Sequence, residues 1–77
     1  MKNLDNKSLN ILREALPEDG YMQIQDRLGE FTIDYIRKIL YGKRRSSKVI
    51  EMALEVAREE KERRDALKKE IAELASI

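Results

Sequence analysis

The stretch QIQDRLGEFTIDYIRKILYGKR, residues 23–44, decides how this chain of 77 residues folds. Large apolar side chains recur in it at steps of three or four residues on both sides of a glycine: Ile24, Leu28, Ile36, Ile39 and Leu40. This spacing is typical of one face of an α-helix. Gly29 can adopt the left-handed conformation that ends a helix. We therefore expect two short helices joined by a tight turn.

Residues around the break support these boundaries. The first of the two helices is expected from about Tyr21 to Leu28. Thr32 can cap the N-terminus of the second helix through its hydroxyl, and Asp34 lies in its first turn, where a carboxylate favours the helix dipole. Phe31 is expected to fill the turn between the helices. Two helices that cross at a large angle would then share a small core.

The rest of the chain also predicts helices. Leucines at three- and four-residue steps predict a helix from about Ser8 to Leu16, which PEDG at residues 17–20 interrupts. Gly42 is expected to end the helix that follows Thr32. After a KRRS loop, Ser46 or Ser47 would cap a last helix that meets no Gly or Pro before the end of the chain. The sequence predicts a small all-α fold of four or five helices with a long C-terminal helix.

Composition excludes several kinds of protein. The chain has no Cys and no His, which removes disulfides, the usual zinc ligands and the commonest general base. The sequence has no nucleophile–base pair, glycine-rich phosphate loop or metal-ligand cluster, so we expect no enzyme, cofactor or metal. It has no apolar run of the roughly 20 residues that span a bilayer, and its start lacks the apolar core of a signal peptide. A cytoplasmic protein without a membrane partner is expected.

Charge is unevenly distributed along the chain. Residues 1–36 carry four cations and seven acids, and residues 49–77 carry six cations and eight acids. Residues 37–48, between them, carry six cations and no acid. A local block of one sign predicts a docking site for an anion, whereas the mixed charges of the last helix are typical of a solvated surface.

The stretch at residues 23–44 resembles the helix-turn-helix of phage-repressor and Cro-like proteins (the Xre type), whose usual form is close to LAxxLGVSxSYISxIxxGKR. The matching residues are Leu28-Gly29, Thr32, Tyr35-Ile36, Ile39 and Gly42-Lys43-Arg44. The resemblance extends over roughly Leu9 to Val56 and implies a lambda-repressor-like domain. Gln25 stands where the family has a small Ala. Glu30-Phe31 replaces a single apolar residue, which predicts a turn one residue longer.

The same resemblance implies a function and a role for each matching position. It implies sequence-specific binding of double-stranded DNA by a transcriptional regulator, a repressor of bacterial, phage or mobile-element origin. Side chains expected to face the bases are Thr32, Ile33, Asp34, Arg37, Lys38 and Tyr41. Those expected on the DNA backbone are Gln23, Gln25, Lys43, Arg44, Arg45 and Lys48. Arg37 and Lys38 are the candidates for guanine edges, while Tyr41 either stacks on a base or packs at the helix margin.

The long last helix predicts a second role. Residues 1–57 are assigned to the DNA-binding domain and residues 58–77 to a helical extension. A heptad-like seam runs along this helix, with a polar break in its middle: Ile50, Ala53, Ala57, Glu60, Arg64, Leu67, Ile71 and Leu74. The seam predicts a possible homodimer, and a projecting solvated helix is the alternative.

Two other functions remain open at this point. One is a protein-interaction module in which the long helix binds a partner. The other is a structured-RNA binder that uses the same positive charge. Binding to duplex DNA should weaken steeply with salt, and RNA of matched length would separate the nucleic-acid alternatives.

Overall fold

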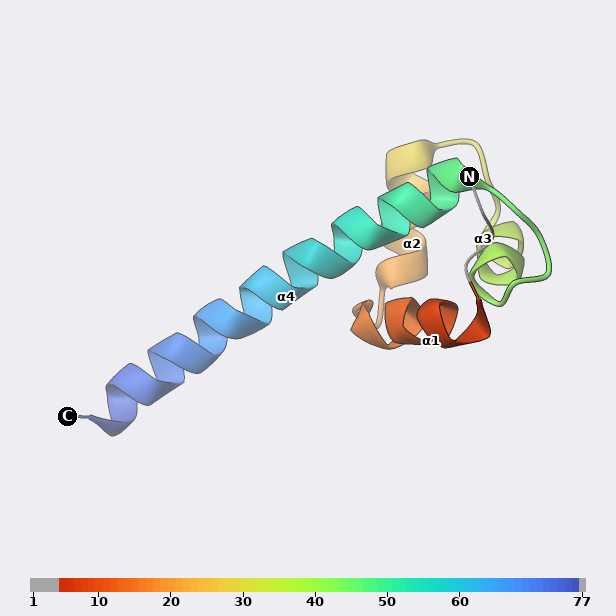
Figure 1. Cartoon of the computed structure of the whole chain (residues 1–77). Helices are drawn as coiled ribbons and strands as arrows, with labels where there is room; N and C mark the ends of the chain where they lie inside the picture. Colours follow the sequence, from red (N-terminus) through yellow and green to blue (C-terminus); the bar gives the residue numbers. More distant parts are fainter. Residues whose placement is uncertain (1–4, 77) are drawn as a thin grey trace.

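The computed structural model describes residues 5–76 and contains no strand in that part of the chain (Figure 1). It has four helices: α1 (Asn6–Ala15), α2 (Gly20–Leu28), α3 (Ile33–Leu40) and α4 (Ser47–Ala75). The predicted all-α fold with a long C-terminal helix is confirmed. Within the described residues, no helix is both long and apolar enough to cross a membrane.

The first helix begins earlier than its leucine spacing predicts. Its cap is Asp5, whose carboxylate accepts a hydrogen bond of 2.7 Å from the backbone N–H of Ser8. This hydrogen bond holds the pKa of Asp5 below its usual value, because it favours the charged form. The predicted start at Ser8 is therefore wrong by two residues, since helix α1 starts at Asn6. The helix ends before Leu16, just ahead of Pro17.

The turn between α2 and α3 contains the predicted glycine and the predicted helix cap. Gly29 has a φ of +70°, and its backbone N–H donates to the carbonyl of Gln25 over 2.8 Å. A side chain at this position would strain the backbone, because only glycine adopts a positive φ without cost. The hydroxyl of Thr32 accepts from the backbone N–H of Tyr35 over 3.1 Å and caps α3. A cap of this kind typically stabilises a helix by about 1 kcal/mol.

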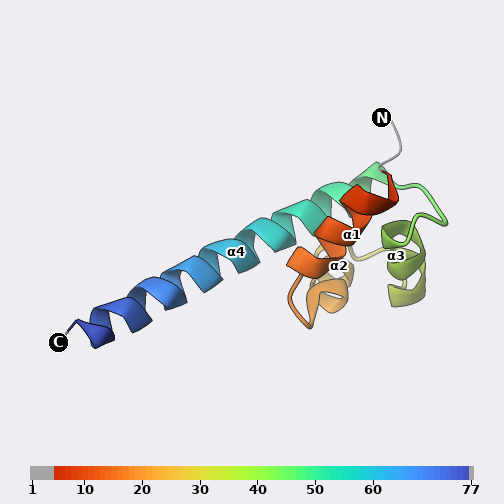
Figure 2. The ribbon, with the colours of Figure 1, turned by 60° about the horizontal axis from the view of Figure 1, so that its bottom comes forward.

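The core lies between the first half of α4 and the three shorter helices. Helices α1, α2 and α3 all contact α4, and α2 does so most extensively. Figure 2 shows the short helices gathered around one half of the long helix. The buried residues of this cluster come from all four helices: Leu12, Ile24, Ile36, Ile39, Leu40, Val49, Ala53, Val56 and Ala57.

The second half of α4 leaves the domain. The last buried residue is Glu60, and every residue from Lys61 to Ser76 is exposed. Both ribbon views show this segment running away from the other helices (Figures 1 and 2). The molecule is consequently elongated, with extents of 50 × 26 × 18 Å. The packed part of the chain extends three residues past the expected division at residues 57 and 58.

Ile36 tests the arrangement of this core. Its side chain is fully buried, so Ile36→Ala should lower the free energy of unfolding by about 2–5 kcal/mol. Chemical denaturation of the purified protein measures the change. Ile11→Ala is the matched control, because Ile11 is exposed on α1 and should give a much smaller effect. Equal midpoints for the Ile36 variant and the parent chain would contradict the placement of α3.

Candidate nucleic-acid interface

Helix α3 has one buried side and one exposed side. Ile36, Ile39 and Leu40 point into the core and fix the helix on the domain. Of the side chains predicted to face bases, five lie in α3 or at its ends and are exposed: Thr32, Asp34, Arg37, Lys38 and Tyr41. Ile33 is half-buried. The predicted base-reading residues therefore lie on a single short helix whose apolar side is already occupied.

Asp34 organises the cations of α3. Its carboxylate lies 3.2 Å from the Lys38 ammonium and 4.0 Å from the Arg37 guanidinium, one turn along the helix. All three side chains are exposed, and such pairs contribute little to stability because water and salt screen them. The pairing nevertheless holds both cations beside the Asp34 carboxylate on the exposed surface of α3.

A Schellman motif ends α3 and directs the basic loop away from the helix. Gly42, at a φ of +82°, donates to the carbonyl of Ile39 over 3.1 Å, and Lys43 donates to that of Lys38 over 2.9 Å. The loop residues Lys43, Arg44 and Arg45 are exposed immediately beyond this motif. All six cations of the block at residues 37–48 are therefore exposed, on α3, in the loop and at the start of α4.

Tyr41 caps the C-terminus of α3 beside α1. The guanidinium of Arg13 lies 4.1 Å from the centre of the Tyr41 ring, and its Nη1 donates to the carbonyl of Leu40 over 2.6 Å. Tyr41 also lies near Tyr21. The pKa of Tyr21 is raised mainly by burial and further by this neighbouring Tyr41. The Tyr41 ring thus contacts Arg13 at the helix margin, while the residue stays 51% exposed. No sequence pattern indicates this role of Arg13, because its partner lies 27 residues away along the chain.

The ring of Tyr35 packs within the domain. Its ring stacks on that of Phe31 with centroids 5.1 Å apart and an angle of 18° between planes. Both side chains are half-buried against the core. This stacking supports the predicted role of Phe31 as the residue that fills the turn, and it adds Tyr35 to that packing.

The two glutamines of α2 have partners within the protein. The amide of Gln23 donates to the Asp19 carboxylate over 2.8 Å at the start of the helix. The amide of Gln25 lies further along α2, is half-buried, and donates to the carbonyl of Phe31 over 3.2 Å. Gln25 therefore satisfies a carbonyl of the turn. The two departures from the repressor-like form, Gln25 and the longer turn, are physically linked by this hydrogen bond.

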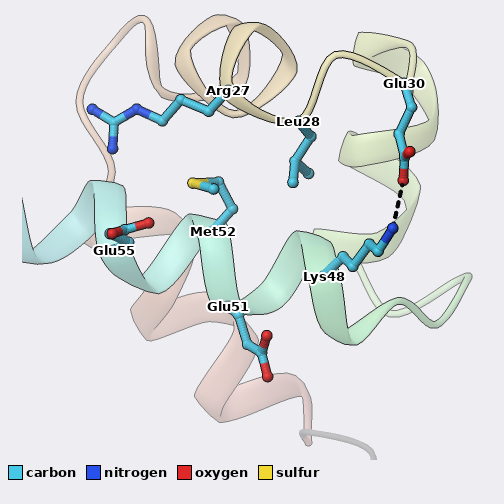
Figure 3. A pocket seen from close by; sticks show the side chains of 7 residues that line it. All are labelled: Arg27, Leu28, Glu30, Lys48, Glu51, Met52 and Glu55. Carbon is cyan, nitrogen blue, oxygen red and sulfur yellow. Dashed lines mark hydrogen bonds and ion pairs between the residues drawn. The ribbon is translucent and has the colours of Figure 1, made fainter.

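Lys48 lies where α4 begins, facing the turn after α2. Its ammonium is 3.1 Å from the Glu30 carboxylate, at one end of a shallow hollow between α2 and α4 whose floor includes Leu28 and Met52 (Figure 3). At the other end, Arg27 donates to both carboxylate oxygens of Glu59 over 2.7 and 2.6 Å. That pairing lowers the pKa of Glu59, and the two ion pairs join α2 and its turn to α4.

Comparison with known proteins found no match: no protein-family model, no curated protein and no solved structure corresponds to this chain. The relationship to repressor-like proteins stays a resemblance based on the residues quoted above. The predicted contacts to bases and to the DNA backbone likewise stay predictions.

Gln25 provides a test of the turn. Gln25→Ala removes the donor to the Phe31 carbonyl and should lower the free energy of unfolding by about 1 kcal/mol. Asp26→Ala is the control at the next, exposed position, where a change within about 0.5 kcal/mol is expected. Urea denaturation of both variants measures the difference. Equal values for the two variants would show that the hydrogen bond contributes nothing to the turn.

Proposed function

We propose that this chain binds double-stranded DNA in a sequence-specific manner and acts as a transcriptional regulator. The observation that carries the proposal is the combination of an exposed, one-sided helix α3 with the basic loop that directly follows it. Repression is the favoured direction of regulation, because the matching residues resemble those of phage repressors. Bacterial, phage or mobile-element origin follows from the same resemblance. A cytoplasmic location is proposed as the default for a sequence without a bilayer-spanning apolar run.

Helix α3 has the properties needed to read bases. The major groove of DNA admits an α-helix, and side chains that point outward from it reach the base edges. Arg37 and Lys38 are exposed on the side of α3 opposite to its buried isoleucines. Both can donate to the O6 and N7 acceptors of guanine. Asp34 would exchange its contacts with these cations for an amino group of cytosine, or would keep one cation oriented.

The basic loop has the properties needed to bind phosphates. Lys43, Arg44 and Arg45 are exposed, and the Schellman motif fixes the direction in which they leave α3. Contacts of this kind position a protein on the duplex without reading its sequence. Lys48 would join them after releasing Glu30, which is inexpensive because that ion pair is exposed.

A homodimer through α4 belongs to the same proposal. Regulators of this size gain affinity and specificity when two copies occupy two half-sites, and two-fold dimers are the commonest assemblies. Leu67, Ile71 and Leu74 are the large apolar residues exposed on the projecting segment of α4, residues 61–76, so that segment is the proposed contact. The protein-interaction function considered from the sequence would use the same segment.

Arg37 tests base recognition. On a preferred site, obtained by selection from random duplexes, Arg37→Ala should cost about 1–3 kcal/mol of binding free energy. It should cost much less on random DNA of equal length. Fluorescence anisotropy at one fixed salt concentration measures both. Equal losses on the two duplexes would mean that Arg37 contacts only phosphate, and Arg58→Ala on the exposed surface of α4 is the control.

Arg44 and Arg45 test the phosphate contacts. Each substitution to Ala should weaken binding to all duplexes alike and reduce the salt slope by about one unit. Titrations over a range of salt concentrations measure the slope, with Arg58→Ala on the exposed surface of α4 as the control. Unchanged slopes in both loop variants would place the basic loop away from DNA. Tighter binding to structured RNA than to duplex DNA would favour the RNA function.

A further inference from the structure

The exposed apolar residues of α4 continue the face that the core already uses. Ala53, Glu60, Leu67 and Leu74 follow one another at seven-residue steps, and so do Ala57, Arg64 and Ile71. Such steps keep residues on nearly the same side of a helix, with a drift of about 20° per heptad. Ala53, Ala57 and Glu60 are buried. Leu67, Ile71 and Leu74 are 52%, 64% and 70% exposed because the other helices end before them.

This continuity limits how a second helix can lie against the projecting segment, residues 61–76. A partner helix on this face occupies a position about 8–10 Å from the α4 axis. Further towards the N-terminus of α4, the same position is filled by the shorter helices of the domain, which bury Val49, Ala53 and Val56. A partner helix parallel to α4 continues towards the N-terminus of α4, and past Glu60 it would collide with this domain. A partner running the opposite way can end there.

We propose that two copies of this chain pair antiparallel through their projecting segments, with the end of each helix reaching the domain of the other. The proposal rests on the proposed homodimer and adds its orientation and register. Each segment is sixteen residues long, which gives an overlap of roughly 24 Å. In this register Leu67 lies opposite the partner's Ile71, and Arg64 lies opposite the partner's Leu74.

Charge along the segment matches this orientation. Residues 61–69 carry five cations and two acids, a net charge of +3, whereas residues 70–76 carry two acids and no cation. Antiparallel pairing places the positive part of each copy beside the negative part of the other. Parallel pairing would place like charges together, with Arg64 facing the partner's Arg64.

The charge at the C-terminal end of α4 also favours antiparallel pairing. The last turn of the helix contains no basic residue, so the negative end of its dipole has no cation of its own. In the antiparallel pair, Arg63 and Arg64 lie near the partner's helix end. Both already bind Glu60, at 3.6 and 3.5 Å, and this pairing holds them at the junction between domain and segment. Their exposed guanidinium groups remain accessible to a second acceptor.

Disulfide trapping tests the orientation directly, because the chain has no cysteine of its own. Arg64→Cys and Leu74→Cys proteins are mixed in equal amounts in a glutathione redox buffer, and the linked products are separated by mass. Antiparallel pairing predicts the mixed dimer, in which position 64 of one copy joins position 74 of the other. It should exceed the proportion that random pairing gives. Dimers of each variant with itself, or a random mixture, would overturn the proposal.

Sedimentation of the full chain at tens of micromolar tests the contact itself. Ile71→Glu should raise the dissociation constant of the dimer by at least about tenfold, because each dimer loses two buried isoleucines. Ala72→Glu adds the same charge about 100° around the helix from Ile71, outside the seam, and should leave the constant unchanged. A monomeric parent chain, or equal effects of the two variants, would overturn the pairing. Binding to a single half-site, and its weakening in the Arg44 and Arg45 variants, would still test the DNA-binding function separately.

Discussion

The apolar face of α4 between Val49 and Glu60 is the surface on which the rest of the domain is built. Helices α1, α2 and α3 each contact it, and none of them is long enough to be stable in water alone. Two of its central residues are alanines, Ala53 and Ala57, and both are buried. Small side chains allow neighbouring helices to approach closely, so the short helices can converge on one length of α4. The position and orientation of α3 depend on this convergence.

Local signals in the sequence were sufficient to place most helix ends. The caps at Gly29 and Thr32 involve hydrogen bonds that reach no more than four residues, and residue type alone predicts them. Residue type left Ser46 and Ser47 as alternatives for the last helix, and Ser46 is the cap. The start of α1 was misplaced because the leucine spacing marks the packed side of a helix and not its first turn. Asp5 lies before the first leucine of that spacing and adds a turn that packing does not require.

The contacts that the sequence did not predict are those between distant residues. Arg13 reaches the last carbonyl of α3, and Lys48 reaches Glu30, yet nothing in either segment identifies its partner. The hydrogen bond from Gln25 to Phe31 spans only six residues, but it was missed because the family pattern has no equivalent. The candidate interface was predictable as a set of exposed cations on one helix and its loop. Their pairing with Asp34 is also local, because residues three and four apart are neighbours on a helix.

The projecting half of α4 has a thermodynamic consequence. A separate peptide of sixteen residues would be only marginally helical in water, because the first turn of a helix is costly to form. Here the folded domain already holds the preceding turns, so each further residue only extends an existing helix. The helical order of this segment therefore depends on the folded domain and should decline from Glu60 towards the C-terminus. Warming would shorten the helix from its free end while the core remains folded, and the surface offered to another molecule would shrink with it.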